Sequence, residues 1–247
     1  MKRSVVVTGA CGGIGRAVAS NFRRAGWTVI GVDRREPDDD VELDRFELAD
    51  VGRDGEVADL FERLSDLRSL DVLVNNAAVQ VNKPIAETTD DDWNVVINTN
   101  VRSAFQCIRD AQPLLAAVRG SVVNISSVHA IATSMNVAVY AISKAALAAL
   151  TRSAAIELAA DGIRCNSLLP GAVDTPMLRD GLDRRPHPDG PDGNLADLAT
   201  RTPLGFVATP EQIAPSVRFL ADGDLSPYTT GQMLVVDGGA TTRLGTE

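Results

Sequence analysis

The chain has 247 residues, of which 45% are hydrophobic and 23% are charged, and this length and composition suffice for one α/β domain with a large core. Its formal net charge of −9 argues against nucleic acid and against an anionic membrane surface as general partners.

Cysteine usage and the N-terminal sequence indicate the compartment. Cys11, Cys107 and Cys165 are odd in number and lack the spacing of metal ligands, which favours a reducing compartment and predicts no metal site. The apolar run Val5-Val6-Val7 is too short for a signal peptide, and no stretch reaches transmembrane length. We therefore expect a cytoplasmic protein that is not bound to a membrane.

The first predicted element is a buried strand at Val5-Val6-Val7, followed by a glycine-rich turn and a helix to about Ala25. Glycines let the backbone approach a pyrophosphate, and the N-terminus of the helix presents free N–H groups to it. We therefore expect a dinucleotide at this turn. The residues predicted to contact it are Gly9, Cys11, Gly12, Gly13, Ile14 and Gly15.

The second predicted strand, Thr28 to Val32, ends at Asp33, which lies 24 residues after Gly9. A carboxylate at this place can accept hydrogen bonds from the adenine-ribose diol, and it repels a 2′-phosphate. Asp33 therefore favours NAD over NADP. Arg34 and Arg35 follow directly and offer that phosphate a partner, so the use of NADP stays open.

Strands and helices then alternate as far as residue 171. The expected ranges are strands at 46–51, 70–74, 121–126 and 164–169, and helices at 55–67, 93–118 and 140–160. Pro113 is expected to kink or break the second of these helices. The alternation predicts a single α/β domain with a doubly wound parallel sheet of the Rossmann type and ligands at the carboxyl ends of its strands.

Tyr140 and Lys144 lie four residues apart on the third of these helices and so share one face of it. A phenol has a pKa of about 10 and is a poor base at neutral pH. One ammonium at about 4 Å, at an effective dielectric of about 20, supplies roughly the 4 kcal/mol needed to lower that pKa by about 3 units. The pair therefore predicts a tyrosinate that accepts a proton.

The alternation fails between Thr175 and Thr209, where prolines, glycines and charged residues are dense. We expect an irregular, exposed segment that forms a substrate lid at about residues 176–208 and is mobile without substrate. The last elements are a helix over 210–220, weakened by Pro215, and a strand over 233–236.

Together these residues resemble the short-chain dehydrogenase/reductase family over essentially the whole chain. The glycine-rich turn resembles its cofactor loop, and Ser127 precedes Tyr140 by 13 residues, as the family's catalytic serine commonly does. The chain departs from the family's pattern at Ala78, where a glycine is usual after Asn75-Asn76-Ala77, and at Phe206 and Ala208 in the lid. Further matches are Asn100-Val101-x-x-x-Phe105, Asp50-Val51, Pro170-Gly171-x-x-x-Thr175, Asp237-Gly238-Gly239 and Tyr140-x-x-x-Lys144.

The resemblance implies reversible hydride transfer between NAD(P) and a secondary alcohol or ketone. Tyr140 would be the acid/base, and Lys144 would lower its pKa and bind the nicotinamide ribose. Ser127 would hold the substrate oxygen, and Asn100 would position a relay water. The cofactor contacts that the resemblance adds are Asp50, Val51, Asn76, Ala77, Tyr140, Lys144, Val173 and Thr175.

The substrate and the assembly are less well defined by the sequence. Gln80, His129 and Asn136 are candidate pocket residues, and together they would favour a polyol, a cyclitol or a sugar; His129 is equally well explained as a loop residue bonded to backbone. Ala-rich helices and the resemblance predict a homotetramer, or a dimer. Alternatives are a 3-oxoacyl-thioester reductase of the same family, a non-catalytic NAD-binding regulator, and a relative of the sugar-nucleotide epimerases.

Overall fold

The computed structural model describes residues 2–38, 41–184 and 186–242. Within these ranges seven strands form one parallel sheet in the order β3-β2-β1-β4-β5-β6-β7. The order reverses between β1 and β4, and open α/β sheets bind ligands outside such a switch point. The predicted doubly wound, Rossmann-type single domain is confirmed. The strands are β1 (Ser4–Thr8), β2 (Thr28–Asp33), β3 (Arg45–Leu48), β4 (Val72–Asn75), β5 (Ser121–Ile125), β6 (Arg164–Pro170) and β7 (Met233–Val236).

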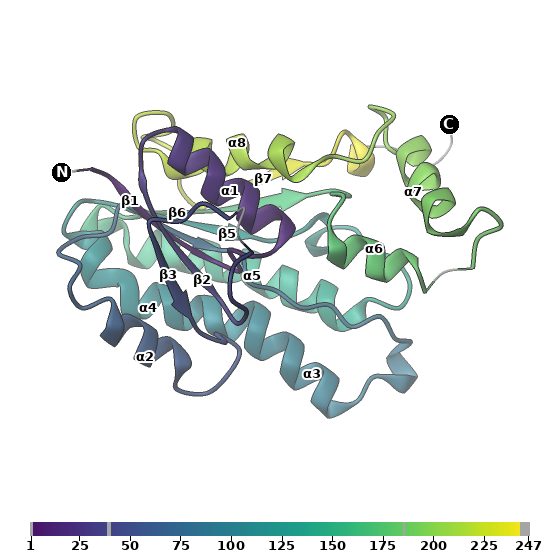
Figure 1. The fold of residues 1–247 in the computed structure, drawn as a ribbon, viewed down its shortest axis with the longest axis horizontal. Coiled ribbons are helices and arrows are strands. Elements are labelled where there is room, and N and C mark those ends of the chain that lie inside the picture. The colour runs from purple at the N-terminus through teal and green to yellow at the C-terminus, as the bar shows by residue number, and fades with distance from the viewer. Residues whose placement is uncertain (1, 39–40, 185, 243–247) are drawn as a thin grey trace.

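Helices cover both faces of the sheet (Figure 1). On one face, α1 (Gly13–Arg24) packs beside α8 (Pro210–Ala221), and on the other lie α2 (Glu56–Arg63), α4 (Ser103–Ala116) and α5 (Ala138–Glu157). Short 3-10 turns are Ile85–Glu87, Val128–Ala130, Ala159–Asp161 and Ala240–Thr242. No helix within the described ranges is long and apolar enough to span a bilayer.

Each face of the sheet has its own apolar core. Val5 and Val7 of β1 pack with Phe22 on the face of α1 and α8, whereas Val6 packs with Leu60 and Leu115 on the other face. Successive side chains of a strand point to opposite faces, so a strand covered on both sides needs apolar residues at every position. This explains the uninterrupted valines of β1.

The expected helix at 93–118 is divided in a different place from the one predicted. α3 (Asp90–Ile97) passes into one π-helical turn, Asn98–Arg102, and this turn continues into α4. Pro113 lies inside α4, which runs on to Ala116, so a break at Pro113 is wrong, and the alternative of a kink there stays a prediction. Burial of Ala111 and Leu115 against the sheet holds this part of the helix together despite the missing N–H donor.

The segment between Thr175 and Thr209 is also more regular than expected. It forms two helices, α6 (Pro176–Leu182) and α7 (Gly190–Arg201), which project beyond the ends of the strands in Figure 1. Thr175 caps α6 by accepting a hydrogen bond from the Leu178 N–H at 3.3 Å, and Pro176 occupies the first helical position, where proline is favoured. The prediction of an irregular loop is therefore wrong for most of this segment; position 185 lies outside the described residues.

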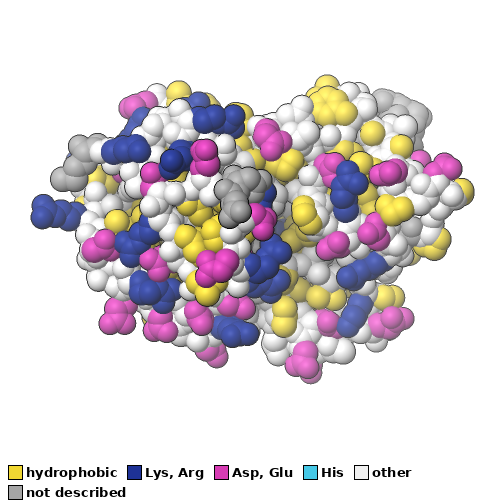
Figure 2. All heavy atoms as spheres, viewed as in Figure 1, with side chains coloured by type: hydrophobic (Ala, Val, Ile, Leu, Met, Phe, Trp, Pro, Cys, Tyr) yellow, Lys and Arg dark blue, Asp and Glu magenta, His cyan; other side chains and the backbone are white. Residues whose placement is uncertain are grey.

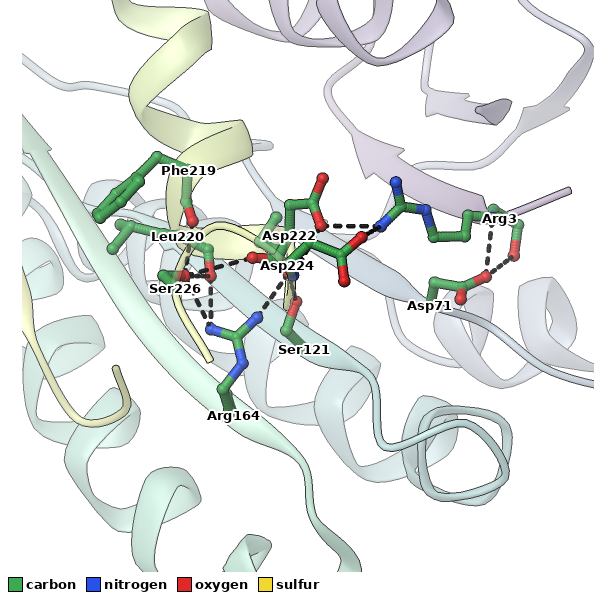
Figure 3. Close-up of polar contacts among 11 residues, drawn as sticks. Arg3, Asp71, Ser121, Arg164, Phe219, Leu220, Asp222, Asp224 and Ser226 are labelled. Carbon is green, nitrogen blue, oxygen red and sulfur yellow. Dashed lines mark hydrogen bonds and ion pairs between the residues drawn. The ribbon is translucent and has the colours of Figure 1, made fainter. Parts of the chain in front are cut away.

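A group of polar contacts fastens the C-terminal end of α8 to the sheet (Figure 3). Arg164, at the start of β6, donates to the backbone oxygens of Leu220 at 2.8 Å and Ala221 at 2.7 Å. Arg3 beside β1 pairs with Asp222 at 2.8 Å. The Arg164 guanidinium thus satisfies carbonyls that the last turn of α8 leaves without an internal partner.

Candidate active site

A cavity of about 860 Å³ opens at the carboxyl ends of the parallel strands. In Figure 2 the surface is hollowed along a furrow between the part that carries the sheet and the part that carries α6 and α7. Most of the predicted site residues line the cavity, and Gly15, Asn100 and Asn136 do not. Those that line it are Gly9, Cys11, Gly12, Gly13, Ile14, Asp33, Asp50, Val51, Asn76, Ala77, Gln80, Ser127, His129, Tyr140, Lys144, Val173 and Thr175.

The glycine-rich turn between β1 and α1 forms a shallow cradle. Gly9 has a φ of +66°, which favours glycine, and a Cβ there would lie 2.9 Å from the Cα of Ala77. A Cβ at Gly15 would overlap the carbonyl oxygen of Gly9, so Gly15 supports the turn from behind. The first turn of α1 carries no acidic residue, which leaves its N–H groups available to an anion.

Asn76, after β4, supports the same turn. Its Nδ2 atom donates to the backbone oxygens of Thr8 and Gly9, both at 3.0 Å. The Thr8 hydroxyl in turn accepts from the backbone N–H groups of Asn76 at 3.0 Å and Ala77 at 3.1 Å. These bonds connect the ends of β1 and β4 at the switch point. The Asn76 amide group is therefore occupied in stabilising the glycine-rich turn.

Asp33 lies at the end of β2, at one end of the cavity. Its Oδ2 accepts from the Cys11 N–H at 3.0 Å and its Oδ1 from the Arg35 N–H at 3.2 Å. A carboxylate oxygen accepts more than one hydrogen bond, so each oxygen retains acceptor capacity toward the cavity. Burial, followed by the charge of Asp33, raises the pKa of Cys11 to about 11. Cys11 is therefore a neutral thiol at neutral pH.

Asp50 follows β3 beside the same end of the cavity. Its Oδ1 accepts from the Gly52 N–H at 3.2 Å, and its Oδ2 lies 3.4 Å from Nε of Arg53. At the opposite wall, Thr175 contacts the cradle, because a Cβ at Gly13 would lie 2.7 Å from its methyl carbon. The turn, the two carboxylates and Thr175 fit an extended dinucleotide with its pyrophosphate at the start of α1.

Tyr140 and Lys144 lie on the first two turns of α5 and face the middle of the cavity. Both are buried, with 8% and 3% of their surface exposed. Nζ of Lys144 donates to the Ile125 carbonyl at 2.8 Å and lies 5.5 Å from the centre of the Tyr140 ring. Ser126 donates to the Lys144 carbonyl at 2.8 Å, so the end of β5 fixes the position of α5 beside it.

The protein's own groups shift the pKa values of this pair away from those expected. Burial raises the pKa of Tyr140 to about 12, and a side-chain hydrogen bond with Ser127 acts in the opposite direction. Burial lowers the pKa of Lys144 to about 8. In the protein alone, desolvation of the phenolate therefore dominates the pKa of Tyr140, and a lowering of that pKa by Lys144 stays a prediction.

Asn100 lies on the π-helical turn and is 2% exposed. Its Oδ1 accepts from the Val79 N–H at 2.8 Å, and its Nδ2 donates to the Val79 carbonyl at 2.9 Å and to the Ser143 hydroxyl at 3.0 Å. The amide thus joins the segment after β4 to α5 and has protein partners at both of its polar atoms.

His129, Gln80 and Asn136 are the three candidate substrate residues. The His129 ring packs edge-on to the Tyr140 ring with centroids 5.7 Å apart, and its Nδ1 lies 3.1 Å from the Thr133 hydroxyl. Gln80 donates to Asn82 at 2.6 Å. Asn136 is exposed, has a φ of +65° and accepts the Lys83 N–H through its carbonyl at 2.9 Å. The structure thus keeps it out of the cavity that Gln80 and His129 line.

Sequence reasoning did not single out the residues that α6, α7 and the C-terminal segment bring to the cavity. The sequence signal for α6 was Thr175 at the N-cap with Pro176 at the first helical position. The dense prolines and glycines that follow obscured this signal. The added lining residues include Met177, Asp180, Arg184, Leu198, Arg201 and Thr241.

Residues 9–241 match a family model described as enoyl-(acyl carrier protein) reductase. A dehydrogenase/reductase SDR family member 6 from Xenopus laevis is 36% identical over 245 residues, covering 95% of this chain and 96% of the relative. A cis-4-hydroxycyclohexanecarboxylate dehydrogenase from Sinomonas cyclohexanicum is 37% identical over 251 residues, covering 97% of each. A 3-oxoacyl-(acyl-carrier-protein) reductase from Thermotoga maritima is 33% identical over 246 residues, covering 95% and 96%.

Solved structures agree with these relatives. A ligand-free aldohexose dehydrogenase from Thermoplasma acidophilum superposes with a TM-score of 0.93 at 30% identity, covering 100% of this chain and 96% of that one. A 4-hydroxyisoleucine dehydrogenase complexed with NADH gives 0.87 at 25% identity, covering 98% and 100%. A putative NAD(P)-dependent gluconate 5-dehydrogenase from Beutenbergia cavernae with bound NADP gives 0.88 at 35% identity, covering 98% and 97%. Similar structures thus hold NADH or NADP.

Proposed function

The chain belongs to the short-chain dehydrogenase/reductase family, and from that premise we propose that it is an NAD-dependent dehydrogenase of secondary alcohols. The observation that carries the proposal is the position of Tyr140, Lys144 and Ser127 around one point of the cavity, beyond a cradle that fits a dinucleotide. A bound nicotinamide supplies the hydride acceptor, and the protein supplies orientation and proton transfer.

In this proposal Tyr140 exchanges the proton of the substrate hydroxyl through its phenol oxygen. Ser127 bonds the same substrate oxygen and holds it in hydrogen-bond reach of that phenol. Lys144 holds the nicotinamide ribose and contributes positive charge next to the phenol. Asn100 has an indirect role in this proposal. Its hydrogen bonds to Val79 and Ser143 fix α5, which carries Tyr140 and Lys144, relative to the segment after β4.

We assign NAD rather than NADP to this chain because of Asp33. Its carboxylate lies at the end of β2 with acceptor capacity toward the cavity, which suits the two ribose hydroxyls and repels a 2′-phosphate. Arg34 and Arg35 also line the cavity and oppose this preference, so the assignment rests on the carboxylate outweighing them.

For the substrate we propose a polar secondary alcohol, such as a polyol, a cyclitol or a sugar. Gln80 and His129 line the cavity and offer hydrogen-bonding groups, and the His129 ring lies against the phenol ring. The matched relatives named for cyclohexanecarboxylate, aldohexose and gluconate act on polar alcohols of this kind. We also propose that α6 and α7 form the substrate lid, over about residues 176–208, and that the protein is a cytoplasmic homotetramer.

An initial-rate screen tests the proposed function. Sugars, cyclitols, hydroxysteroids and hydroxy acids would each be offered with NAD and with NADP, and Tyr140→Phe would serve as the inactive control. We expect NAD reduction with at least one class of alcohol and a higher kcat/KM for NAD than for NADP. Binding of NADH without turnover of any alcohol would favour a non-catalytic regulator instead.

A 3-oxoacyl-thioester reductase is the second candidate, and the Thermotoga maritima relative supports it. Asp33 opposes this candidate if the reductase depends on NADPH. NADPH-dependent reduction of an acetoacetyl thioester, faster than NAD-dependent oxidation of every alcohol in the screen, would establish it.

A further inference from the structure

The proposed lid contains arginines that are held in two different ways. Arg179 of α6 donates to both carboxylate oxygens of Asp174, at 2.6 and 2.7 Å, and its Nη1 lies 3.6 Å from Asp192. Arg179 is not among the residues that line the cavity. Its charge is therefore used within the protein.

Arg184 and Arg201 are held differently. Both line the cavity. The nearest carboxylate to Arg201 is Asp197, at 3.8 Å, and the Arg201 side chain is 72% exposed. No hydrogen bond or ion pair joins Arg184 to any other residue in the described part of the chain. Two arginines of the lid thus line the cavity, Arg184 without an ion pair in the described part of the chain and Arg201 with a single, long one of 3.8 Å to Asp197.

The two arginines come from different segments of the lid, one after α6 and one at the end of α7. Arg184 follows α6, where a Cβ at Gly181 would lie 3.5 Å from the Asn82 side chain, the bonding partner of Gln80. Arg201 ends α7, where Leu204 donates to the Gly238 carbonyl at 3.1 Å beside the C-terminal segment. Asp180 is the one carboxylate among the described lid residues that line the cavity. The lid therefore contributes a net positive charge there.

Arg184 lies away from the glycine-rich turn, where the pyrophosphate of the dinucleotide is expected. α6 starts at Pro176, directly after Thr175, which contacts the glycine-rich turn. Seven residues of helix, Pro176–Leu182, span roughly 10 Å at about 1.5 Å per residue. Arg184 follows the far end of this helix, away from the turn. The 2′-position of a bound dinucleotide would lie farther still, beside Asp33.

We propose that Arg184 and Arg201 bind a carboxylate of the substrate, so that the enzyme acts on hydroxy acids or keto acids. A guanidinium presents paired donors that match a carboxylate, and such charge-assisted bonds are stronger than neutral ones. The anion would bridge a residue after α6 and a residue at the end of α7. This inference rests on the proposed function, since it names the substrate class of that same site.

Matched anionic and neutral alcohols test the inference. Gluconate is compared with glucitol, and 4-hydroxycyclohexanecarboxylate with its methyl ester, by kcat/KM for NAD reduction. We expect the unmutated enzyme to prefer the anion in at least one pair by about tenfold or more, which is about 1.4 kcal/mol. Arg184→Gln and Arg201→Gln should each reduce that preference severalfold. Arg179→Gln, which removes the same charge from the same segment, should preserve it.

A binding measurement separates this inference from the proposed function. The enzyme–NADH complex is titrated with gluconate and with 4-hydroxycyclohexanecarboxylate by calorimetry. At least one anion should bind, more weakly to the two variants than to the unmutated protein. Such binding without any alcohol oxidation would overturn the proposed function and keep the anion site. Oxidation of neutral and anionic alcohols with equal kcat/KM would overturn the anion site alone. So would a loss of NADH affinity in Arg184→Gln and Arg201→Gln equal to their loss of substrate affinity, because the arginines would then hold the cofactor.

Discussion

Tyr140 lies in surroundings that keep its phenol protonated. Burial raises the pKa of Tyr140 to about 12, and the hydrogen bond with Ser127 opposes this shift. Reduction of a ketone needs the protonated phenol, whereas oxidation of an alcohol needs the phenolate. If Tyr140 is the acid/base of the proposed oxidation, its pKa falls when oxidised NAD is bound, because a nearby positive charge stabilises the phenolate.

The raised pKa of Tyr140 predicts how the rate of alcohol oxidation depends on pH. The phenolate is the base, so a raised pKa moves the rise in rate to higher pH, and the positive charge of oxidised NAD moves it back. Burial lowers the pKa of Lys144 to about 8, so Lys144 adds positive charge only below that pH. At saturating NAD we expect the rate to level off below about pH 10, the ordinary range of a phenol. The apparent pKa belongs to the coupled Tyr140–Lys144 pair. Tyr140→Phe should abolish the rise and reduce turnover by at least about 10²-fold, while Lys144→Met should also weaken NAD binding.

Initial rates with one alcohol across the pH range, and titrations with NADH, measure these effects. If Tyr140→Phe oxidises alcohol at a near-normal rate while chemistry limits turnover, Tyr140 is not the acid/base. A rate that still rises steeply above about pH 11 would mean that bound NAD does not lower the pKa.

Asp33 is predicted to determine the preference for NAD over NADP. Asp33→Ser should weaken NAD binding and narrow its lead over NADP, because the ribose loses two acceptors and a 2′-phosphate loses a repelling charge. Arg34→Gln is the matched change next to it and should widen that lead. Kd values for NADH and NADPH measure both effects. Tighter binding of NADPH than NADH by the unmutated protein would show that Arg34 and Arg35 outweigh Asp33.

Residues whose role follows from local spacing could be placed from the sequence. Tyr140 and Lys144 share a face because they lie one helical turn apart, and Asp33 ends a strand whose length could be read. Asn136 could not be placed, because its distance from the cavity depends on a positive φ and a loop contact with Lys83. Arg184 could not be found either, because only the tertiary placement of α6 brings it to the cavity.

At the scale of elements, the contact of β6 with α8 gives a prediction of stability. Arg164 donates four hydrogen bonds, to Leu220, Ala221, Ser226 and Thr229. Arg164→Met should destabilise the fold by about 2 to 4 kcal/mol, since unsatisfied buried acceptors cost about 1 to 3 kcal/mol each. Urea unfolding with a two-state fit measures the change. Arg68→Met, at an exposed arginine, should change stability little; an equal loss in both variants would contradict the role of Arg164.

The proposed lid helices α6 and α7 predict that bound ligands protect this segment from proteases. We expect protease cleavage between α6 and α7 to slow when NAD and a substrate are both bound, because closure brings their cavity-lining residues onto the ligand. Digestion time courses with and without both ligands, with mass spectrometry of the cut sites, measure this. Cleavage at equal rates in the two conditions would count against a lid.

Helix and strand periodicity predicted most elements. The errors lie where helix-breaking residues occur together with residues that favour a helix. Proline at position 113 predicted a break, but apolar packing of Ala111 and Leu115 maintained α4 around it. Breaker density obscured α6 and α7, although Thr175-Pro176 carries the cap and first-turn residues of a helix start. The π-helical turn at Asn98–Arg102 had no local signal, because it is set by the bonds of Asn100 to Val79 and Ser143.

At the scale of the whole molecule, alternating strands and helices determined the parallel sheet, since parallel strands need crossover connections. The order of the strands and the place of the switch point depend on which strands pair, which no local pattern specifies. The cavity could nonetheless be located, because the carboxyl ends of all parallel strands meet at one edge of the sheet.

Assembly is the remaining property at this scale. An exposed stripe runs along α5 through Ile142, Ala145, Ala149 and Ile156, whereas Ala148 faces the core. Ile156 is 79% exposed, and small alanines in the stripe allow another helix to approach closely. Phe105 of the neighbouring α4 is 51% exposed. Contiguous exposed apolar side chains of this kind are typical of interfaces, and we propose that this surface joins copies of the chain.

We expect a tetramer, or a dimer, in sedimentation at micromolar concentration. The double change Ala149→Asp and Ile156→Asp should reduce the assembly, because two carboxylates on each copy would have to lose water and face like charges across a symmetric contact. Ile85→Asp is the matched control, since Ile85 is also 79% exposed but lies on a 3-10 turn away from α4 and α5. A monomer before any substitution would refute the prediction. An assembly that survives the double change would place its contacts on another surface of the molecule.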